Sequence, residues 1–192
     1  MKQKLTIVTS NANKAVEVAA FFSGALEVTH VALEIPEHRS DDVGEIARGK
    51  AQYAYDQLQT PLIVDDTGFS IDALNGFPGP YAAYVLHTLG NTGILKLMDS
   101  VKNRQAHFTT AIAYADESGI HVFTGSIHGN IPTSLRGENG FGYDPIVDID
   151  GRTLAEMSLE EKSVISHRAK ALAAFRDWFL EKYPSDSLDT NG

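Results

Sequence analysis

The sequence predicts an α/β protein, in which helices flank a β-sheet. Strand and helix patterns alternate through the first 64 residues, the order typical of an α/β layer. A pair of long alternating segments then predicts a β-hairpin. The chain has 192 residues, 43% of them hydrophobic, so it can build a substantial core. We expect one domain over residues 1–192.

The first part of the chain predicts a βαβαβ order. Short apolar runs predict three strands, at 5–8, 26–31 and 62–64. Amphipathic segments predict helices between them, at 14–22 and 45–58. The first helix is expected to bury four residues: Val16, Ala19, Ala20 and Phe22. The second carries an apolar stripe: Ala47, Ala51, Ala54 and Leu58.

The second part begins with a loop rich in Gly and Pro at 76–81. A helix is expected at 91–101, followed by hairpin strands at 107–115 and 120–127. Two further helices are predicted, one from Ser158 and one at 167–182. Leu172, Phe175 and Phe179 form the core stripe of the last helix. The polar tail at 184–192 is expected to be frayed.

Composition excludes several classes of partner and site. The formal net charge of −9 argues against binding to nucleic acid polymers or anionic membranes, which requires a basic surface. The absence of Cys excludes disulfides and thiolate metal sites. No apolar stretch reaches the length of a membrane span, and the first residues lack the long apolar region of a signal peptide. We therefore expect a cytoplasmic protein.

The segment 62–68 carries two adjacent acids, Asp65 and Asp66, directly after an apolar run. Two buried carboxylates repel each other unless a cation is nearby, so this pattern indicates a metal site. The sequence Asp-Asp-Thr-Gly also suits a turn. Neighbouring side chains of a strand point to opposite faces, so only one acid can face a given ligand.

Two segments have patterns suited to phosphate or to simple helix capping. Thr9, Ser10, Asn11 and Lys14 lie between a predicted strand and a helix, where free backbone N–H groups attract anions. The same residues can cap the helix. His167 and Arg168 follow Ser166, a predicted N-cap, and two cations at this end of a helix suggest an anionic partner.

The segment 139–145 places Phe141 between two glycines and is followed by Asp144. Such a ring could stack on a base, or it could anchor the loop. Glu45 is expected to begin a helix, where an acid is favourable, and it is also a candidate metal ligand facing Asp65 or Asp66.

Together these segments resemble the inosine triphosphate pyrophosphatase (Ham1) family, enzymes that act on non-standard purine nucleotides. The resemblance rests on six segments in family order: TSNANK at 9–14, EI at 45–46, VDDTGF at 64–69, NGFPGPY at 75–81, GFGYDP at 140–145 and EEKSVISHRAKAL at 160–172. It spans nearly the whole chain. It implies an elongated, two-lobed α/β fold with a central twisted mixed sheet, and a homodimer.

The resemblance also implies a reaction. A purine nucleoside triphosphate, namely ITP, dITP or XTP, would be hydrolysed to the monophosphate and pyrophosphate with Mg²⁺ as cofactor, removing deaminated purines from the nucleotide pool. By position, Asp66 and Glu45 match the metal-binding acids, and Asp66 also matches the proposed general base. Asp65 is left as a supporting acid.

The substrate contacts are implied in the same way. A loop and a neighbouring residue match the triphosphate site: Thr9, Ser10, Asn11, Lys14 and Thr67. Lys14 would also offset charge on the leaving group. The base-binding segment matches Phe141, Gly142, Tyr143 and Asp144. Lys162 matches a substrate-binding lysine, and His167 with Arg168 the pair that reads the base.

Two positions depart from the family pattern. Ser10 stands where Gly is usual, and Ala83 where a Lys or Arg is common.

Two alternative functions are weighed against the one implied by the resemblance. One is a Maf-like nucleotide pyrophosphatase of different specificity, against which the 140–145 and 166–168 segments argue. The other is a nucleotide-binding regulator without turnover, against which Glu45 and Asp66 argue.

Overall fold

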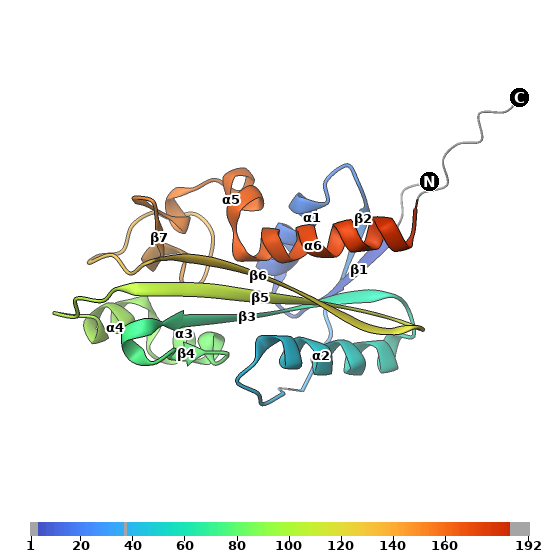
Figure 1. The fold of residues 1–192 in the computed structure, drawn as a ribbon, viewed down its shortest axis with the longest axis horizontal. Coiled ribbons are helices and arrows are strands. Elements are labelled where there is room, and N and C mark those ends of the chain that lie inside the picture. The colour runs from blue at the N-terminus through green and yellow to red at the C-terminus, as the bar shows by residue number, and fades with distance from the viewer. Residues whose placement is uncertain (1–3, 37, 185–192) are drawn as a thin grey trace, which may run out of the picture.

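An open, mixed β-sheet forms the centre of the protein (Figure 1). The computed structural model describes residues 4–36 and 38–184, so the predicted tail lies outside the described residues except for residue 184. The strands are β1 (Lys4–Val8), β2 (Glu27–Val31), β3 (Leu62–Ile71), β4 (Pro78–Gly79), β5 (Gln105–Asp116), β6 (Gly119–Asn130), β7 (Asp148–Ile149) and β8 (Arg152–Thr153).

Helices cover both faces of this sheet. The α-helices are α1 (Ala12–Phe21), α2 (Val43–Leu58), α3 (Ala82–Thr88), α4 (Gly90–Leu97), α5 (Leu159–Ile165) and α6 (His167–Lys182). Short 3-10 helices are η1 (Asp72–Leu74), η2 (Asp144–Ile146) and η3 (Leu154–Glu156). In Figure 1, α1, α5 and α6 lie above the sheet and α2, α3 and α4 below it, and the molecule is elongated along the long strands.

The strand order is β2-β1-β3-β5-β6-β7-β8, with β4 paired to β3. The strands β2, β1 and β3 pair in parallel, whereas β3 pairs with β5, and β5 with β6, in the antiparallel direction. Parallel strands joined by helices and an antiparallel hairpin thus share one sheet. The predicted α/β class and the mixed sheet implied by the resemblance are confirmed.

The strand that carries the two acids is longer than the sequence indicated. The predicted strand ended at Val64, but β3 continues to Ile71 because β5 pairs with it along all ten of its residues. The parallel partner β1 pairs only with 62–64 and ends at Val8. Asp65 and Asp66 therefore lie within β3, directly beyond the end of β1, where they pair with Ile112 and Ala111 of β5.

The helices reproduce most of the predicted segments. The bounds predicted for α6 are confirmed, and α5 begins near Ser158 as predicted, with Ser158 capping it through a capping box. The first helix begins earlier than expected, at Ala12 after the cap Asn11. This start turns Ala15 and Val18 toward the sheet, so the prediction that Val16 is buried was wrong, and Val16 is 54% exposed.

Ala19 and Ala20 are likewise outside the core, whereas Phe22 is fully buried as predicted. The region 82–88 forms α3, which was not predicted, and α4 ends at Leu97 rather than at 101. The loop that precedes α3 is rich in Gly and Pro, and for this reason no helix was predicted directly after it.

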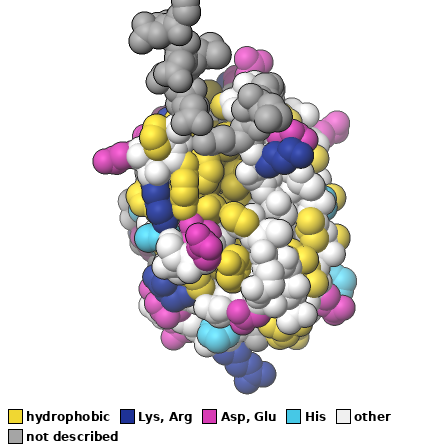
Figure 2. Space-filling view, turned by 90° about the vertical axis from the view of Figure 1, so that its right-hand side faces the viewer, with side chains coloured by type: hydrophobic (Ala, Val, Ile, Leu, Met, Phe, Trp, Pro, Cys, Tyr) yellow, Lys and Arg dark blue, Asp and Glu magenta, His cyan; other side chains and the backbone are white. Residues whose placement is uncertain are grey.

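The surface at the end of the β5–β6 hairpin mixes apolar and charged side chains (Figure 2). Hydrophobic side chains gather there, and both acidic and basic side chains surround them. Within residues 4–36 and 38–184, no helix combines the length and the apolar character that crossing a membrane would require.

Candidate active site

Three adjoining pockets lie along β3. We call the first the aromatic pocket; it has a volume of about 130 Å³ and is bordered by Phe108, Phe141, Tyr143 and His167. The second, the acidic pocket, has about 240 Å³ and contains Asp65 and Asp66. The third, the outer pocket, has about 420 Å³ and adjoins Asp66 from the other side.

Shared walls join these pockets in a fixed order. Asn11, Lys14 and Thr67 line both the aromatic and the acidic pocket. Asp66 and Pro80 line both the acidic and the outer pocket. The acidic pocket therefore connects the other two pockets into one continuous cleft, and the buried Asp66 lines two of its three parts.

The pleat of β3 sends the two acids to different helices. Asp65 points toward α1 and α6, where Arg168 donates from Nε to its Oδ2 at 2.7 Å and Lys14 pairs with its Oδ1. Asp66 points toward α2, where the Lys50 ammonium lies 2.6 Å from its Oδ1. The prediction that neighbouring acids face opposite sides is confirmed.

The different partners give the two carboxyls different acidities. Burial alone would raise the pKa of Asp65, but the charges of Arg168 and Lys14 outweigh burial and hold this pKa well below its usual range. For Asp66 burial prevails over the attraction of Lys50, and its pKa is raised. Asp65 therefore stays ionised as a counterion, whereas Asp66 is more basic and better suited to accept a proton.

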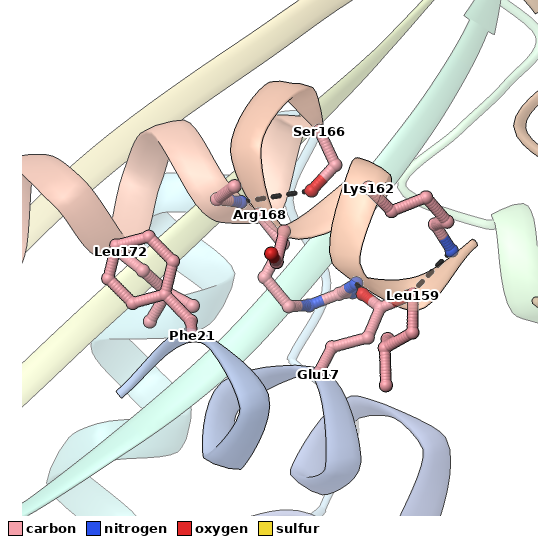
Figure 3. A pocket seen from close by; sticks show the side chains of 9 residues that line it. Glu17, Phe21, Leu159, Lys162, Ser166, Arg168 and Leu172 are labelled. Carbon is pink, nitrogen blue, oxygen red and sulfur yellow. Dashed lines mark hydrogen bonds and ion pairs between the residues drawn. The ribbon is translucent and has the colours of Figure 1, made fainter. Parts of the chain in front are cut away.

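A chain of alternating charges runs from Asp65 to Arg168 at the start of α6 and on to α1 and α5. Figure 3 shows its central part, where Glu17 lies between Arg168 and Lys162. Arg168 pairs with Glu17 of α1, and Glu17 accepts a hydrogen bond from Lys162 at 2.6 Å. Lys162 also donates to Asp144 at 2.7 Å. Glu17 thus reaches between two cations of α5 and α6, which fixes both side chains at the wall of the cleft.

Helix caps set the positions of these cations. Ser166 ends α5 and caps α6, its hydroxyl accepting from the Ala169 N–H at 3.1 Å, as predicted. His167 and Arg168 are therefore the first residues of α6 and are only 4% and 2% exposed. Arg168 meets its anions within the protein itself, because it pairs with Asp65 and Glu17.

The aromatic pocket is built from rings that come from distant segments. His167 stacks on Phe108 with ring centroids 4.4 Å apart, and Tyr143 stacks on Phe69 at 4.5 Å. Burial lowers the pKa of His167 well below its ordinary value, which keeps the ring neutral at neutral pH. Its Nδ1 is buried and has no hydrogen-bond partner among residues 4–36 and 38–184, so it can bond to a ligand.

The loop before η2 needs glycine at one position in particular. Gly140 has φ of +71°, and a Cβ there would lie 2.0 Å from Asp144 Oδ2. Asp144 instead accepts from the Phe141 N–H at 2.8 Å, and burial raises its pKa. Phe141 consequently lines the aromatic pocket, with Lys162 Nζ 5.3 Å from its ring centroid.

The segment 9–14 forms the predicted strand-to-helix turn. Asn11 caps α1, and its side chain accepts from the N–H groups of Asn13 and Lys14. The capping interpretation is therefore correct, and the same turn lines the acidic pocket with Thr9, Ser10, Asn11 and Lys14. Capping leaves the Lys14 side chain free to extend across the pocket to Asp65.

Thr67 holds the boundary between the aromatic and acidic pockets. Its hydroxyl lies 2.7 Å from that of Thr110, which is fully buried in β5. Arg168 donates from Nη2 to the same Thr67 oxygen at 3.3 Å. Thr67 therefore connects β5 to α6 at the point where the two pockets meet.

Glu45 as a metal ligand facing Asp65 or Asp66 stays a prediction, and it is not among the described residues that line the acidic pocket. Glu45 is exposed in the first turn of α2. At about 100° per residue it lies nearly opposite Ala47, which is buried against the sheet. In the described part of the chain, no three His, Asp or Glu side chains converge as a metal cluster. A metal in the acidic pocket would have Asp66 as its protein ligand.

Three residues of the site were missed in the sequence. Lys50 lies beside the alanine stripe of α2, Glu17 follows Lys14 by one helical turn, and Thr110 alternates with core residues of β5. Lys50 had a signal in the sequence, because it is a charge next to the buried alanine stripe of α2. Glu17 had none, because its partners come from α5 and α6. Thr110 had none, because its partner comes from another strand.

Comparison with known proteins shows which proteins this chain is similar to. The chain matches the family model described as the Ham1 family over residues 5–178. It is 47% identical over 180 residues to a dITP/XTP pyrophosphatase of Methanopyrus kandleri, covering 92% of this chain and 96% of the relative. It is 43% identical over 180 residues to inosine triphosphate pyrophosphatase 1 of Trypanosoma cruzi, covering 92% of each.

A solved structure is also similar. A HAM1 protein from Coxiella burnetii matches with a TM-score of 0.81 at 28% identity, covering 93% of this chain and 99% of that one.

Proposed function

This chain belongs to the Ham1 family, and we propose that it hydrolyses ITP, dITP and XTP to the monophosphate and pyrophosphate, removing non-standard purines from the nucleotide pool. The observation that carries this proposal is the continuous cleft, in which an aromatic pocket opens into a pocket of cations and acids. A flat base fits the first, and a triphosphate the second.

The base would stack on Phe141 in the aromatic pocket. Arg168 is held by Asp65, Glu17 and Thr67, so its remaining N–H groups have a fixed direction. Hypoxanthine and xanthine carry a 6-oxo acceptor where adenine carries an amino donor. Donors from Arg168 and His167 would pair with the oxo group, whereas adenine would leave buried donors unpaired, which discriminates strongly.

The triphosphate would lie along the turn 9–14. The Lys14 and Lys50 ammonium groups reach the acidic pocket from opposite sides, from α1 and α2. As substrate phosphates enter, both lysines can exchange carboxylate partners for phosphate oxygens. This exchange places positive charge where the leaving pyrophosphate gains negative charge.

Asp66 would be the general base. It accepts a proton from water, whose oxygen forms a bond to the α-phosphorus. The bond between this phosphorus and the oxygen bridging to the β-phosphate then breaks, and the electron pair leaves with pyrophosphate. The raised pKa of Asp66 suits this role, because it brings the carboxyl closer to the operating pH.

Mg²⁺ is the cofactor that these residues fit. It prefers oxygen ligands and commonly binds through one or two carboxylates, waters and substrate phosphates, so the single carboxylate of Asp66 on the acidic pocket suffices for the protein's share. Bound there, it would neutralise phosphate charge. Glu45 stays a predicted second ligand, although it lies exposed on α2. A cytoplasmic homodimer is likewise part of the proposal.

The test is pyrophosphate release from ITP, dITP, XTP, GTP, ATP and dTTP with Mg²⁺. We expect release from the first three, its loss with EDTA and its recovery with added Mg²⁺. Asp66→Asn should abolish turnover while the unfolding temperature stays near that of the parent. Asp177→Asn, at an exposed site of α6, is the matched control. Turnover by Asp66→Asn would remove Asp66 from the mechanism, and an inactive parent would refute the function.

A further inference from the structure

The outer pocket is the largest of the three, and the substrate contacts described above leave it unassigned. We propose that it receives the leaving pyrophosphate, and that Arg39 is the cation that binds it there. This inference rests on the proposed hydrolysis and adds a binding residue to it.

The position of the outer pocket follows from the order of the cleft. The base lies at one end, the acidic pocket is in the middle, and Asp66 and Pro80 are walls common to the acidic and outer pockets. A nucleotide that enters base first directs its terminal phosphates away from the aromatic pocket. Those phosphates meet the outer pocket directly beyond Asp66.

Charge distribution assigns Arg39 to this end. In the acidic pocket Lys14 pairs with Asp65, and Lys50 with Asp66. These two cations therefore face two acids, and the pocket has no net positive charge for a triphosphate. Arg39 lines the outer pocket and is exposed, and within the described chain it has no carboxylate within ion-pair distance. It is thus a cation available to an incoming anion.

The absence of charge at position 83 strengthens the assignment. Ala83 lines all three pockets, so a long cationic side chain there would reach the phosphates. Alanine leaves this central position without charge and opens the passage between the pockets. Arg39, which lies in the segment between β2 and α2, supplies a positive charge to the outer pocket instead.

Neighbouring groups add donors without adding negative charge. His38 lies against Gly49 of α2, with its ring about 3.1 Å from where a Cβ would stand, and this contact positions the segment that carries Arg39. The hydroxyls of Ser40, Tyr81 and Tyr84 belong to side chains of the same pocket. Among the described residues that line the outer pocket, Asp66 is the one acidic side chain. A pyrophosphate bound here would leave the monophosphate in the other two pockets.

The test compares the two products separately. Binding of pyrophosphate and of IMP is measured by calorimetry with Mg²⁺, together with inhibition of ITP hydrolysis by added pyrophosphate. Loss of a charge-assisted interaction predicts that Arg39→Ala weakens pyrophosphate binding by about 10- to 100-fold. IMP binding should change less than about twofold, because IMP does not reach the outer pocket. Arg39→Lys should keep most of the pyrophosphate affinity.

Arg176→Ala is the control, because it removes the same charge from an exposed site on α6. It should leave the binding of both products unchanged. Equal pyrophosphate affinity in Arg39→Ala and the parent overturns the proposal, as does an equal loss for IMP and pyrophosphate. Failure of the parent to release pyrophosphate from ITP would instead refute the hydrolytic function, so the two failures are distinguishable.

Discussion

Replacing Asp65 with Asn should destabilise the protein far more than an ordinary surface substitution. The Asp65 side chain is fully buried and contacts both Arg168 and Lys14. Asparagine keeps the shape but leaves two cations without their shared counterion, and breaking a buried ion pair in this way costs about 3–5 kcal/mol. For a chain of this size, that loss lowers the unfolding temperature by roughly 6–20 °C.

The effect should depend on pH in a defined direction. The pKa of Asp65 is lower in the folded protein than in the unfolded chain, where it is near 3.8. Its contribution to the free energy of unfolding is therefore complete above that value and is lost as the pH falls toward the folded pKa. The difference between parent and Asp65→Asn should stay constant at neutral pH and shrink below about pH 4.

Urea unfolding at pH 7 and at a series of acidic pH values measures this difference. Asp177→Asn is the matched control, since it makes the same chemical change at an acid whose side chain is 70% exposed. An exposed ion pair contributes about 0–1 kcal/mol. If Asp65→Asn costs no more than Asp177→Asn, the buried charge chain does not stabilise this fold and the reasoning is wrong.

Three further outcomes test other parts of the structure. Gly125→Ala should destabilise by about 1–3 kcal/mol or more in urea unfolding, because a Cβ there would lie 2.4 Å from the His167 carbonyl oxygen and 2.5 Å from the Ala171 nitrogen. Arg168→Ala should narrow the preference for ITP over ATP by at least about tenfold in kcat/KM, and an unchanged ratio would remove Arg168 from base reading. The pKa of His167 is lowered by burial, so its unfolded form binds more protons below about pH 6.5. Stability should therefore fall as pH drops through that value, and His167→Gln should flatten the decline between pH 8 and 5.

The parts of the fold that could be predicted depend on local pattern. Helix α6 was predicted to the residue because Ser166 caps it and Phe175 and Phe179 repeat at helical spacing. The length of β3 could not be predicted in this way. Residues 65–71 are strand because β5 pairs with them, and the acids, Thr and Gly in that segment read locally as a turn.

The residues of the site also fall into two groups, those predictable from local motifs and those that depend on long-range packing. Lys14, Asp66, Phe141 and Arg168 stand in motifs, and the structure brings them to one cleft. The residues that orient them do not stand in motifs. Glu17 meets Lys162 across 145 residues of sequence, a pairing that only the packing of α1 against α5 creates.

The register of β3 explains why two adjacent acids do different work. Ile63 and Asp65 face the helix α6 side, whereas Val64 and Asp66 face α2, because successive side chains alternate across the sheet. If the pairing of β3 with β5 shifted by one residue, Asp65 would turn toward Lys50 and Asp66 would turn toward Arg168. Pairing with β5 over ten residues prevents such a shift. The long antiparallel pairing therefore assigns one acid to hold the base-reading arginine and the other to the phosphates.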